Sequence, residues 1–277
     1  MENQTASISR LEWKPDGRLS AAALKYMAAF TMFIDHIAVA LLLTSYTEEG
    51  IAVFRSSEGL NTMYQWMRHI GRFAFPIFCY FVVEGYFHTR SRIRYCIQLA
   101  VFAAISQSPF VYALFTEKSR LSGYHLNVLF TLLLGLFCIW AVDELVYRPL
   151  FPVYSRSGEG AGEHNGRGAV SLNTALGIAC AVLITCVCCW VADYFHTDYR
   201  YGGVVTILIF YLLRKYPVPA CVTAYFALSL YSSSEVWALP GFIALLFYNG
   251  KRGVQNKYFF YAFYPAHLAF LWLLKGI

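Results

Sequence analysis

Charged side chains are scarce in this sequence. Asp, Glu, Lys and Arg make up 14% of the 277 residues and hydrophobic residues make up 58%, whereas charged residues form about 25% of a typical soluble domain. This composition excludes an ordinary soluble globular protein. The net charge is +6, but no basic arm or basic repeat is present, so we expect no nucleic-acid partner. The composition predicts a polytopic membrane protein whose core is a bundle inside the lipid bilayer.

A metal-binding motif is also missing. The eight cysteines lie within or at the ends of apolar runs. Cys186, Cys188 and Cys189 lie close together, but no second pair of Cys or His stands at the spacing of metal ligands. We therefore expect no metal centre, and we interpret the cysteines as small apolar residues of helices. Their spacing shows no disulfide framework, although it does not exclude a bridge.

The N-terminal region lacks the pattern of a cleavable signal peptide. A stretch of mixed charge precedes the first apolar run. That run is too long for the apolar region of a signal peptide, and no small-residue cleavage site follows it. We expect residues 1–21 to form a cytoplasmic N-terminal segment and the first apolar run to remain as a membrane span.

Long apolar runs predict an all-α fold, a polytopic transmembrane helix bundle of about eight to ten spans, because a spanning helix needs about 20 apolar residues. The three runs between residues 202 and 249 are short and are interrupted by proline and glycine. They are thin or tilted spans, or discontinuous helices that face a cavity. The predicted spans are residues 22–45, 69–88, 94–115, 125–147, 169–192, 202–215, 217–232, 235–249 and 258–275.

The loops between these runs predict the orientation of the chain. With nine spans and a cytoplasmic N-terminus, most Lys and Arg residues of the loops fall on the cytoplasmic side, as the positive-inside rule requires. Residues 148–169 are rich in Gly, Ser, Pro and charge. We expect this segment to be a flexible cytoplasmic linker.

Two ionisable residues stand side by side in the first span. Asp35 and His36 interrupt the apolar stretch "TMFIDHIAVALLL", and an ionisable residue at membrane depth is costly and usually functional. Lys25 lies about three helical turns before His36, so the two share one side of the helix, whereas Asp35 points about 100° away. Arg72 in the second span lies at a depth comparable to Asp35. We therefore predict an Asp35–Arg72 ion pair.

Other polar residues lie in or near the spans. Glu84 lies in the inner half of the second span, below Pro76, which we expect to kink the helix. His267 follows Tyr264 in the last span, and Asn127 begins the fourth. Each of these residues can instead tie helices together by hydrogen bonds, and the positive-inside rule alone can explain any single arginine. The predicted basic mouth consists of Lys25, His88, Arg90, Arg92 and Arg94, and the further cavity candidates are Glu84, Asn127 and Tyr264.

These positions together predict a polar column through the bundle. A basic cytoplasmic mouth suits a phosphorylated ligand, because guanidinium and ammonium groups bind phosphate. The imidazole of His36, in the outer half, suits proton transfer or nucleophilic attack, because the pKa of histidine ordinarily lies near neutral pH.

The blocks "MFIDHIA", "GRFAFPIFCYFVVEGYFHTRSRIRY", "AAISQSPF", "HLNVLFTLLLGL", "YGGVVTILIFYLLR" and "FYPAHLAFLWLL" resemble the TraX family of conjugal-transfer proteins. The resemblance covers most of the chain outside residues 149–169. It implies a single transmembrane acyltransferase-like domain over residues 1–277, in the bacterial inner (cytoplasmic) membrane. The family's activity is N-terminal acetylation of a conjugative pilin. One group of transmembrane acyltransferases carries a basic residue, ten residues and then His, and Lys25 and His36 match this spacing.

The resemblance implies acetyl transfer from cytosolic acetyl-CoA to an acceptor at the outer side of the membrane. The acceptor is a pilin-like protein or a glycan, and O- and N-acetylation both remain open. We assign His36 as the general base or as the carrier of the acetyl group. Asp35 orients neighbouring helices or neutralises Arg72, and Arg72 or His267 stabilises the developing oxyanion. The basic mouth holds the phosphates of acetyl-CoA.

Two other functional classes remain open. A proton-coupled secondary transporter would use the buried ionisable groups as a proton relay. A non-catalytic assembly factor for a pilus or secretion system would bind no CoA. The basic mouth favours the acetyltransferase, because a transporter of neutral solutes does not need it. The relay of the transporter would consist of Asp35, Glu84, Arg72 and His267.

Overall fold

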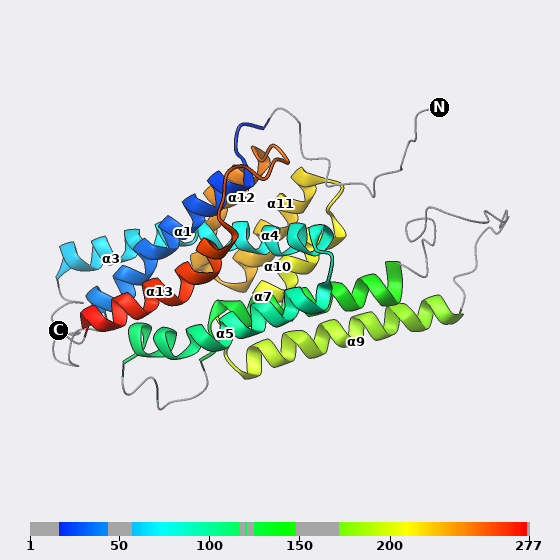
Figure 1. The fold of residues 1–277 in the computed structure, drawn as a ribbon, viewed down its shortest axis with the longest axis horizontal. Helices are drawn as coiled ribbons and strands as arrows, with labels where there is room; N and C mark the ends of the chain where they lie inside the picture. The colour runs from blue at the N-terminus through cyan, green and yellow to red at the C-terminus, as the bar shows by residue number, and fades with distance from the viewer. Residues whose placement is uncertain (1–16, 44–56, 117–119, 121–124, 148–171, 276–277) are drawn as a thin grey trace.

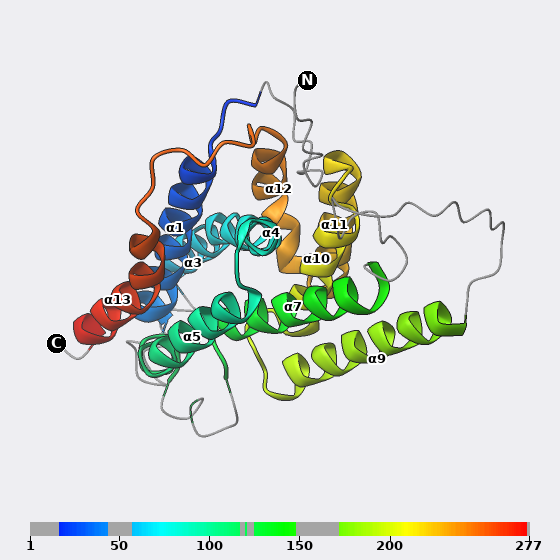
Figure 2. The same cartoon turned by 45° about the vertical axis from the view of Figure 1, so that its right-hand side comes forward.

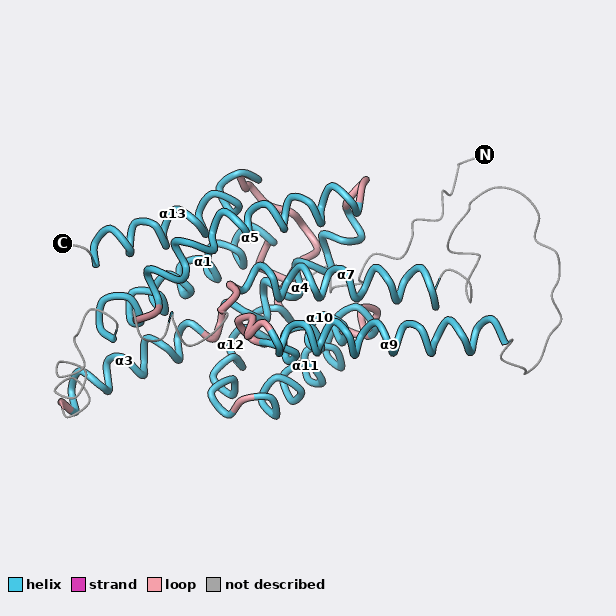
Figure 3. The backbone as a smooth tube through the Cα atoms, turned by 90° about the horizontal axis from the view of Figure 1, so that it is seen from below, coloured by secondary structure: helices cyan, strands magenta, loops and turns pink. Residues whose placement is uncertain are grey.

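The computed structural model describes residues 17–43, 57–116, 120, 125–147 and 172–275. These residues form helices and connecting loops without a β-strand (Figure 3). The predicted all-α fold is therefore confirmed. Most of the predicted N-terminal segment and the whole predicted linker, residues 148–169, lie outside the described residues.

Among the described residues, five helical segments are long and apolar enough to cross a membrane: Ala21–Leu42, Glu58–His88, Arg92–Leu114, Val128–Val146 and Ala175–Tyr194. The helices that build them begin with α1 (Ala21–Ile37), which continues as the π-helix η1 (Ala38–Leu43). The others are α3 (Glu58–Gly71), α4 (Ala74–His88), α5 (Arg92–Leu114), α7 (Val128–Val142) with the π-helix η2 (Asp143–Tyr147), and α9 (Leu172–Tyr194).

The C-terminal part of the chain consists of shorter helices followed by one longer last helix. They are α10 (Arg200–Leu212), α11 (Pro217–Tyr231), the 3₁₀-helix η4 (Ser233–Ala238), α12 (Leu239–Leu246) and α13 (Lys257–Lys275). α10 and α11 rise only about 20 Å, less than the roughly 30 Å of a bilayer core. The five long segments confirm a membrane helix bundle among the described residues. A total of eight to ten spans stays a prediction.

The second predicted span differs from the structure at its outer end. The helix begins earlier, at Glu58, and a turn at Arg72 and Phe73 separates α3 from α4. The predicted kink at Pro76 agrees with the structure. The helical segment is interrupted at Arg72 and Phe73, and the ring of a proline displaces the carbonyl of the residue four positions before it, here Arg72. The bend that the sequence suggested therefore lies just before this proline.

The core surrounds α4, which contacts α1, α7, α10 and α12. Figure 2 shows α4 near the centre of the bundle. Ile77, Cys79 and Val83 of α4 are completely buried. At the edge of the bundle, α9 packs against α7 and α10 (Figure 1) and leaves Val182, Leu183 and other large apolar side chains exposed. Such a surface suits a helix that faces lipid.

Two contacts of the C-terminal region shape the site. The backbone carbonyls of Phe247, Lys251 and Arg252 accept hydrogen bonds of 2.9 to 3.0 Å from amides at the start of α1. These bonds fix the loop before α13 over the helix N-terminus, where backbone N–H groups otherwise lack partners. α13 then packs against α5 and α1 and runs beside α1 in Figures 1 and 2. The last helix is thereby placed against the first.

Candidate functional site

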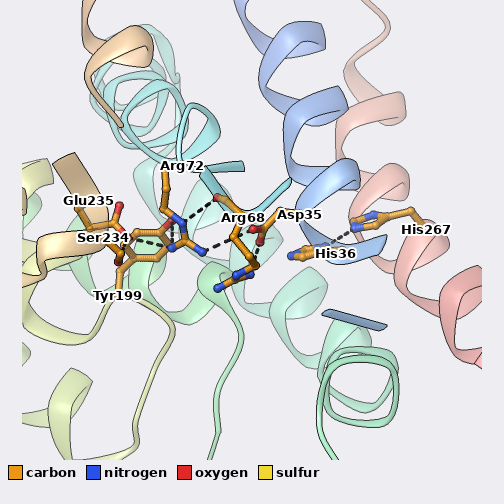
Figure 4. A network of polar contacts seen from close by, with 8 residues as sticks. All are labelled: Asp35, His36, Arg68, Arg72, Tyr199, Ser234, Glu235 and His267. Carbon is orange, nitrogen blue, oxygen red and sulfur yellow. Dashed lines mark hydrogen bonds and ion pairs between the residues drawn. The ribbon is translucent and has the colours of Figure 1, made fainter. Parts of the chain in front are cut away.

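His36 and His267 form a pair of imidazoles between α1 and α13 (Figure 4). Nδ1 of His36 lies 2.7 Å from Nε2 of His267, and the two rings are parallel within 7°, with centroids 5.0 Å apart. Nδ1 of His267 lies 2.7 Å from the backbone carbonyl oxygen of Phe263. A carbonyl only accepts, so Nδ1 of His267 donates to it.

This geometry assigns the protons of two neutral rings. Because Nδ1 of His267 carries the proton, its Nε2 accepts a hydrogen bond from Nδ1–H of His36. Nε2 of His36 is then the unprotonated nitrogen. Among the described residues it has no hydrogen-bond partner, and His36 lines a cavity of about 290 Å³. A buried imidazole with a free lone pair at a cavity wall is the arrangement that a general base needs.

Asp35 takes part in a different network, on the other side of α1 (Figure 4). Its carboxylate lies 3.5 Å from Arg72, as the sequence predicted, but Arg68 is closer, at 2.7 Å. Both arginines line the smaller cavity with His36. Arg68 was not predicted for the site, because it lies just outside the predicted second span, residues 69–88. Arg68 precedes Arg72 by one helical turn, and this spacing could have indicated that both side chains lie on the same face of the helix.

Arg72 holds several elements together. Its guanidinium donates to Glu235 of η4 at 2.9 Å and to the hydroxyl of Tyr199 at 3.2 Å, in addition to its contact with Asp35. Two carboxylates and a phenol surround this guanidinium, so its hydrogen bonds are used within the protein. The geometry suits a structural link between α1, η4 and the start of α10 better than the predicted oxyanion role.

A larger cavity of about 830 Å³ lies on the side of the bundle where α1 begins. Four residues of the predicted basic mouth line this cavity: Lys25, His88, Arg90 and Arg94. Arg252 also lines it. Arg252 was not predicted for this site, because it is brought over α1 by contacts between distant segments, among them the backbone hydrogen bond from the Ala22 amide to the Arg252 carbonyl.

Arg92 lies elsewhere, contrary to its predicted place in the basic mouth. It is absent from the lining of the larger cavity and pairs with Asp143 at 3.0 Å and Glu144 at 2.7 Å. Arg92 and Arg94 are two positions apart on α5, which turns their side chains about 200° from each other. The two residues therefore cannot serve the same cavity.

The two cavities are adjacent inside the bundle. Met32, Phe78 and Val128 line both of them. Lys25 lines the larger cavity and His36 the smaller, so the shared side of α1 runs along both, as its helical spacing predicted. The cavities together give a column with cations near one end and an imidazole at the other.

The further cavity candidates divide into two groups. Glu84 and Tyr264 line the larger cavity, and the carboxylate of Glu84 accepts hydrogen bonds from Tyr80 and Tyr248. Asn127 was predicted wrongly, because it lines neither cavity. Its side chain caps α7 by accepting from the Leu129 amide at 3.0 Å and donates to the carbonyl of Ala103. This is the bonding of a helix N-cap.

Comparison with known proteins places this architecture in a family. A family profile described as TraX protein matches residues 20–275. The chain belongs to the TraX family. The chain is also similar to a probable fimbrial assembly protein FimC, serogroup H1, of Dichelobacter nodosus, with 28% identity over 91% of this chain and 94% of that protein. No solved structure matches this TraX-family chain significantly.

The polar groups of the column do not assemble a metal centre in the described part of this TraX-family protein. No cluster of three or more His, Cys, Asp or Glu side chains there could hold a metal ion. His36 and His267 contact each other through hydrogen-bonding nitrogens, so one nitrogen of each ring is already engaged. The site therefore consists of an imidazole pair beside two adjacent cavities.

Proposed function

We propose that this protein is an integral-membrane acetyltransferase that moves an acetyl group from cytosolic acetyl-CoA to an acceptor at the outer side of the membrane. One observation carries the proposal. The unprotonated Nε2 of His36 lies at a cavity that shares lining residues with a second, larger cavity, and the larger cavity has a basic lining. A base at one end can take the proton of the acceptor, and cations at the other end can bind the phosphates of acetyl-CoA.

The basic end supplies the binding of acetyl-CoA. Lys25, Arg90, Arg94 and Arg252 line the larger cavity and would contact the phosphates of the nucleotide. Lys25 and His36 are separated by about 16 Å along α1, at 1.5 Å per residue. An extended pantetheine arm in the larger cavity would bring the thioester toward His36. Arg92, held by its two carboxylates, takes no part.

The imidazole pair supplies the proton transfer. An amine or hydroxyl of the acceptor attacks the thioester carbonyl and gives its proton to Nε2 of His36. The imidazolium that forms is stabilised because its Nδ1–H donates to His267, which the carbonyl of Phe263 orients. The C–S bond then breaks, and His36 returns the proton to the thiolate of CoA. Asp35 keeps α1 fixed against α3 through Arg68.

The family and its relative support a proposal for the acceptor and its location. The TraX resemblance supports a pilin-like protein in the bacterial inner membrane as acceptor, in conjugation or a related process, and a glycan is the other candidate. The name of the similar D. nodosus protein, a probable fimbrial assembly protein, supports a role connected with pili. It also supports a second candidate function, that of a non-catalytic assembly factor.

Acetyl transfer by the purified protein tests this proposal. CoA release from acetyl-CoA and acetylation of co-expressed pilin-like proteins, followed by mass spectrometry, should both require His36. We expect His36→Ala to lower the rate by at least about 100-fold, in the range typical of general-base catalysis. His196→Ala is the matched control, because His196 is exposed and its ring hydrogen-bonds the nearby Tyr194 carbonyl.

The outcomes separate the two candidate functions. Binding of CoA together with loss of transfer in His36→Ala supports the acetyltransferase. A wild-type protein that binds no CoA and still promotes pilus assembly would instead be an assembly factor. Full activity of His36→Ala would refute the assignment of the base.

A further inference from the structure

One hydroxyl group in the column has no partner. Tyr264 is 5% exposed, and its hydroxyl oxygen is buried without a hydrogen-bond partner in the described part of the protein. Folded proteins rarely bury a tyrosine hydroxyl in this way, and such a group calls for an explanation. Tyr264 lines the larger cavity, so a molecule bound there could accept its hydrogen bond.

A backbone amide stands beside this hydroxyl. Val128 is the first residue of α7, and its N–H lies near the Tyr264 hydroxyl. The Asn127 side chain accepts from the amide of Leu129, and the Asn127 carbonyl accepts from Phe130. Apart from the Tyr264 hydroxyl oxygen, which it faces beyond normal hydrogen-bond distance, no described residue accepts from the Val128 N–H. This donor also carries the partial positive charge of a helix N-terminus.

Both donors lie where the two cavities are adjacent. Val128 lines both cavities, and the ring of Tyr264 lies 6.2 Å from that of His36 and 5.6 Å from that of His267, between centroids. A carbonyl at this junction would lie between the two donors and the base. The oxyanion candidates from the sequence are less suitable. Arg72 is held by Asp35, Glu235 and Tyr199.

His267 is not available for this role either. Its Nδ1–H is used by the Phe263 carbonyl, and its Nε2 accepts from His36. A neutral histidine has only one N–H to donate. The unpartnered donors at the junction are therefore the better match to a developing negative charge.

We propose that the Tyr264 hydroxyl and the Val128 N–H form the oxyanion site for the thioester of acetyl-CoA, an inference that rests on the proposed function. The acceptor nitrogen or oxygen forms a bond to the carbonyl carbon while its proton passes to Nε2 of His36. The carbonyl oxygen becomes negative and accepts hydrogen bonds from Tyr264 and Val128. The C–S bond then breaks, the C=O bond is restored, and the proton on His36 goes to the departing thiolate.

Tyr264→Phe tests the hydroxyl directly. It removes one oxygen and keeps the ring in place. We expect kcat to fall by about 10²- to 10³-fold, as for loss of one oxyanion donor, while the Kd of CoA changes less than about threefold. The melting temperature should stay the same or rise, because the variant removes an unsatisfied buried group. Activity within twofold of wild type would overturn the inference.

Val128→Pro tests the amide, with Val128→Ala as its control. Proline is tolerated at the first position of a helix and removes the N–H. The preceding residue, Asn127, has φ −68° and ψ 166°, which is the conformation that proline demands before it. Both variants remove the valine side chain, but only Val128→Pro also removes the backbone N–H donor. We expect kcat to fall much further in Val128→Pro than in Val128→Ala, and equal rates in the two variants would contradict the role of the amide.

Comparison with His36→Ala separates a failure of the oxyanion site from a failure of the proposed function. If His36→Ala abolishes transfer while Tyr264→Phe and Val128→Pro are fully active, the proposed function stands and the oxyanion site is wrong. If the wild-type protein transfers no acetyl group, the proposed function and this inference both fail.

Discussion

Neighbouring residues in the first helix belong to separate networks. His36 contacts His267 of α13, whereas Asp35 contacts Arg68 and Arg72 at the other side of α1. The 100° between successive helical residues explains this division. The carboxylate of Asp35 therefore does not orient the imidazole of His36 as in a serine-protease triad. His36 instead donates to His267, which in turn donates to the backbone carbonyl of Phe263.

The two arginines near the start of α5 give a test at the same scale. Arg94 lines the larger cavity, and Arg92 is engaged with Asp143 and Glu144. We expect Arg94→Ala to raise the Kd of CoA about tenfold, the effect of losing one hydrogen bond to a charged group. Arg92→Ala should leave the Kd unchanged and lower the melting temperature. Calorimetric titration with CoA and thermal unfolding distinguish the pair, and similar Kd values for both variants would argue against a phosphate site at Arg94.

At the scale of elements, the contact between α1 and α3 depends on a glycine. Gly71 ends α3 against Asp35, and a Cβ at Gly71 would lie 2.3 Å from the Cβ of Asp35. Such a distance is impossible without movement of one helix. The absence of a side chain at Gly71 lets Asp35 reach Arg68 and Arg72, and so sets the position of the smaller cavity wall.

Gly71→Ala should therefore destabilise the protein by about 1–3 kcal/mol, the usual cost of overpacking, and should impair acetyl transfer. Gly59→Ala on the same helix is the control. A Cβ at Gly59 would meet no atom within 4 Å, and alanine favours helix more than glycine does. Thermal unfolding of both variants is the measurement. If Gly71→Ala unfolds at the same temperature as Gly59→Ala, the contact has been misjudged.

At the scale of the whole molecule, the proposed acetyl transfer requires the two cavities to be continuous. Met32, Phe78 and Val128 are the residues that both share. They are apolar, and they line the region between the basic side chains and the imidazole pair. A thioester can lie at this junction while the phosphates stay with the cations and water is kept from the reacting carbonyl.

Met32→Trp should block the junction. We expect the Kd of CoA to change little, because the cations are untouched, and the rate of acetyl transfer to fall by about 100-fold, since small misplacements of the reacting groups have effects of this size. Phe30→Trp on the same helix is the control, because Phe30 is 64% exposed. CoA binding and transfer rates should be measured for both. An active Met32→Trp would mean that the thioester does not pass this point.

Several features were predictable from the sequence because they depend on composition and helical spacing. Apolar runs of sufficient length predicted the all-α membrane bundle, and periodicity predicted the shared side of Lys25 and His36. The Asp35–Arg72 pair followed from comparable depth. The errors have a common cause as well. Arg92 and Asn127 were assigned by position along the chain, whereas the rotation of their helices and local capping decided their contacts.

The sequence by itself determined that the chain forms membrane helices and which residues share a helix face, because lipid demands apolar length and the helix has a fixed period. Only the tertiary structure decided which faces meet. The partner of His36 lies 231 positions away in the chain, and Arg68, Arg252 and Val128 reach the site through contacts between helices and loops. Such contacts depend on the packing of side chains across separate elements, which no local pattern in the sequence specifies.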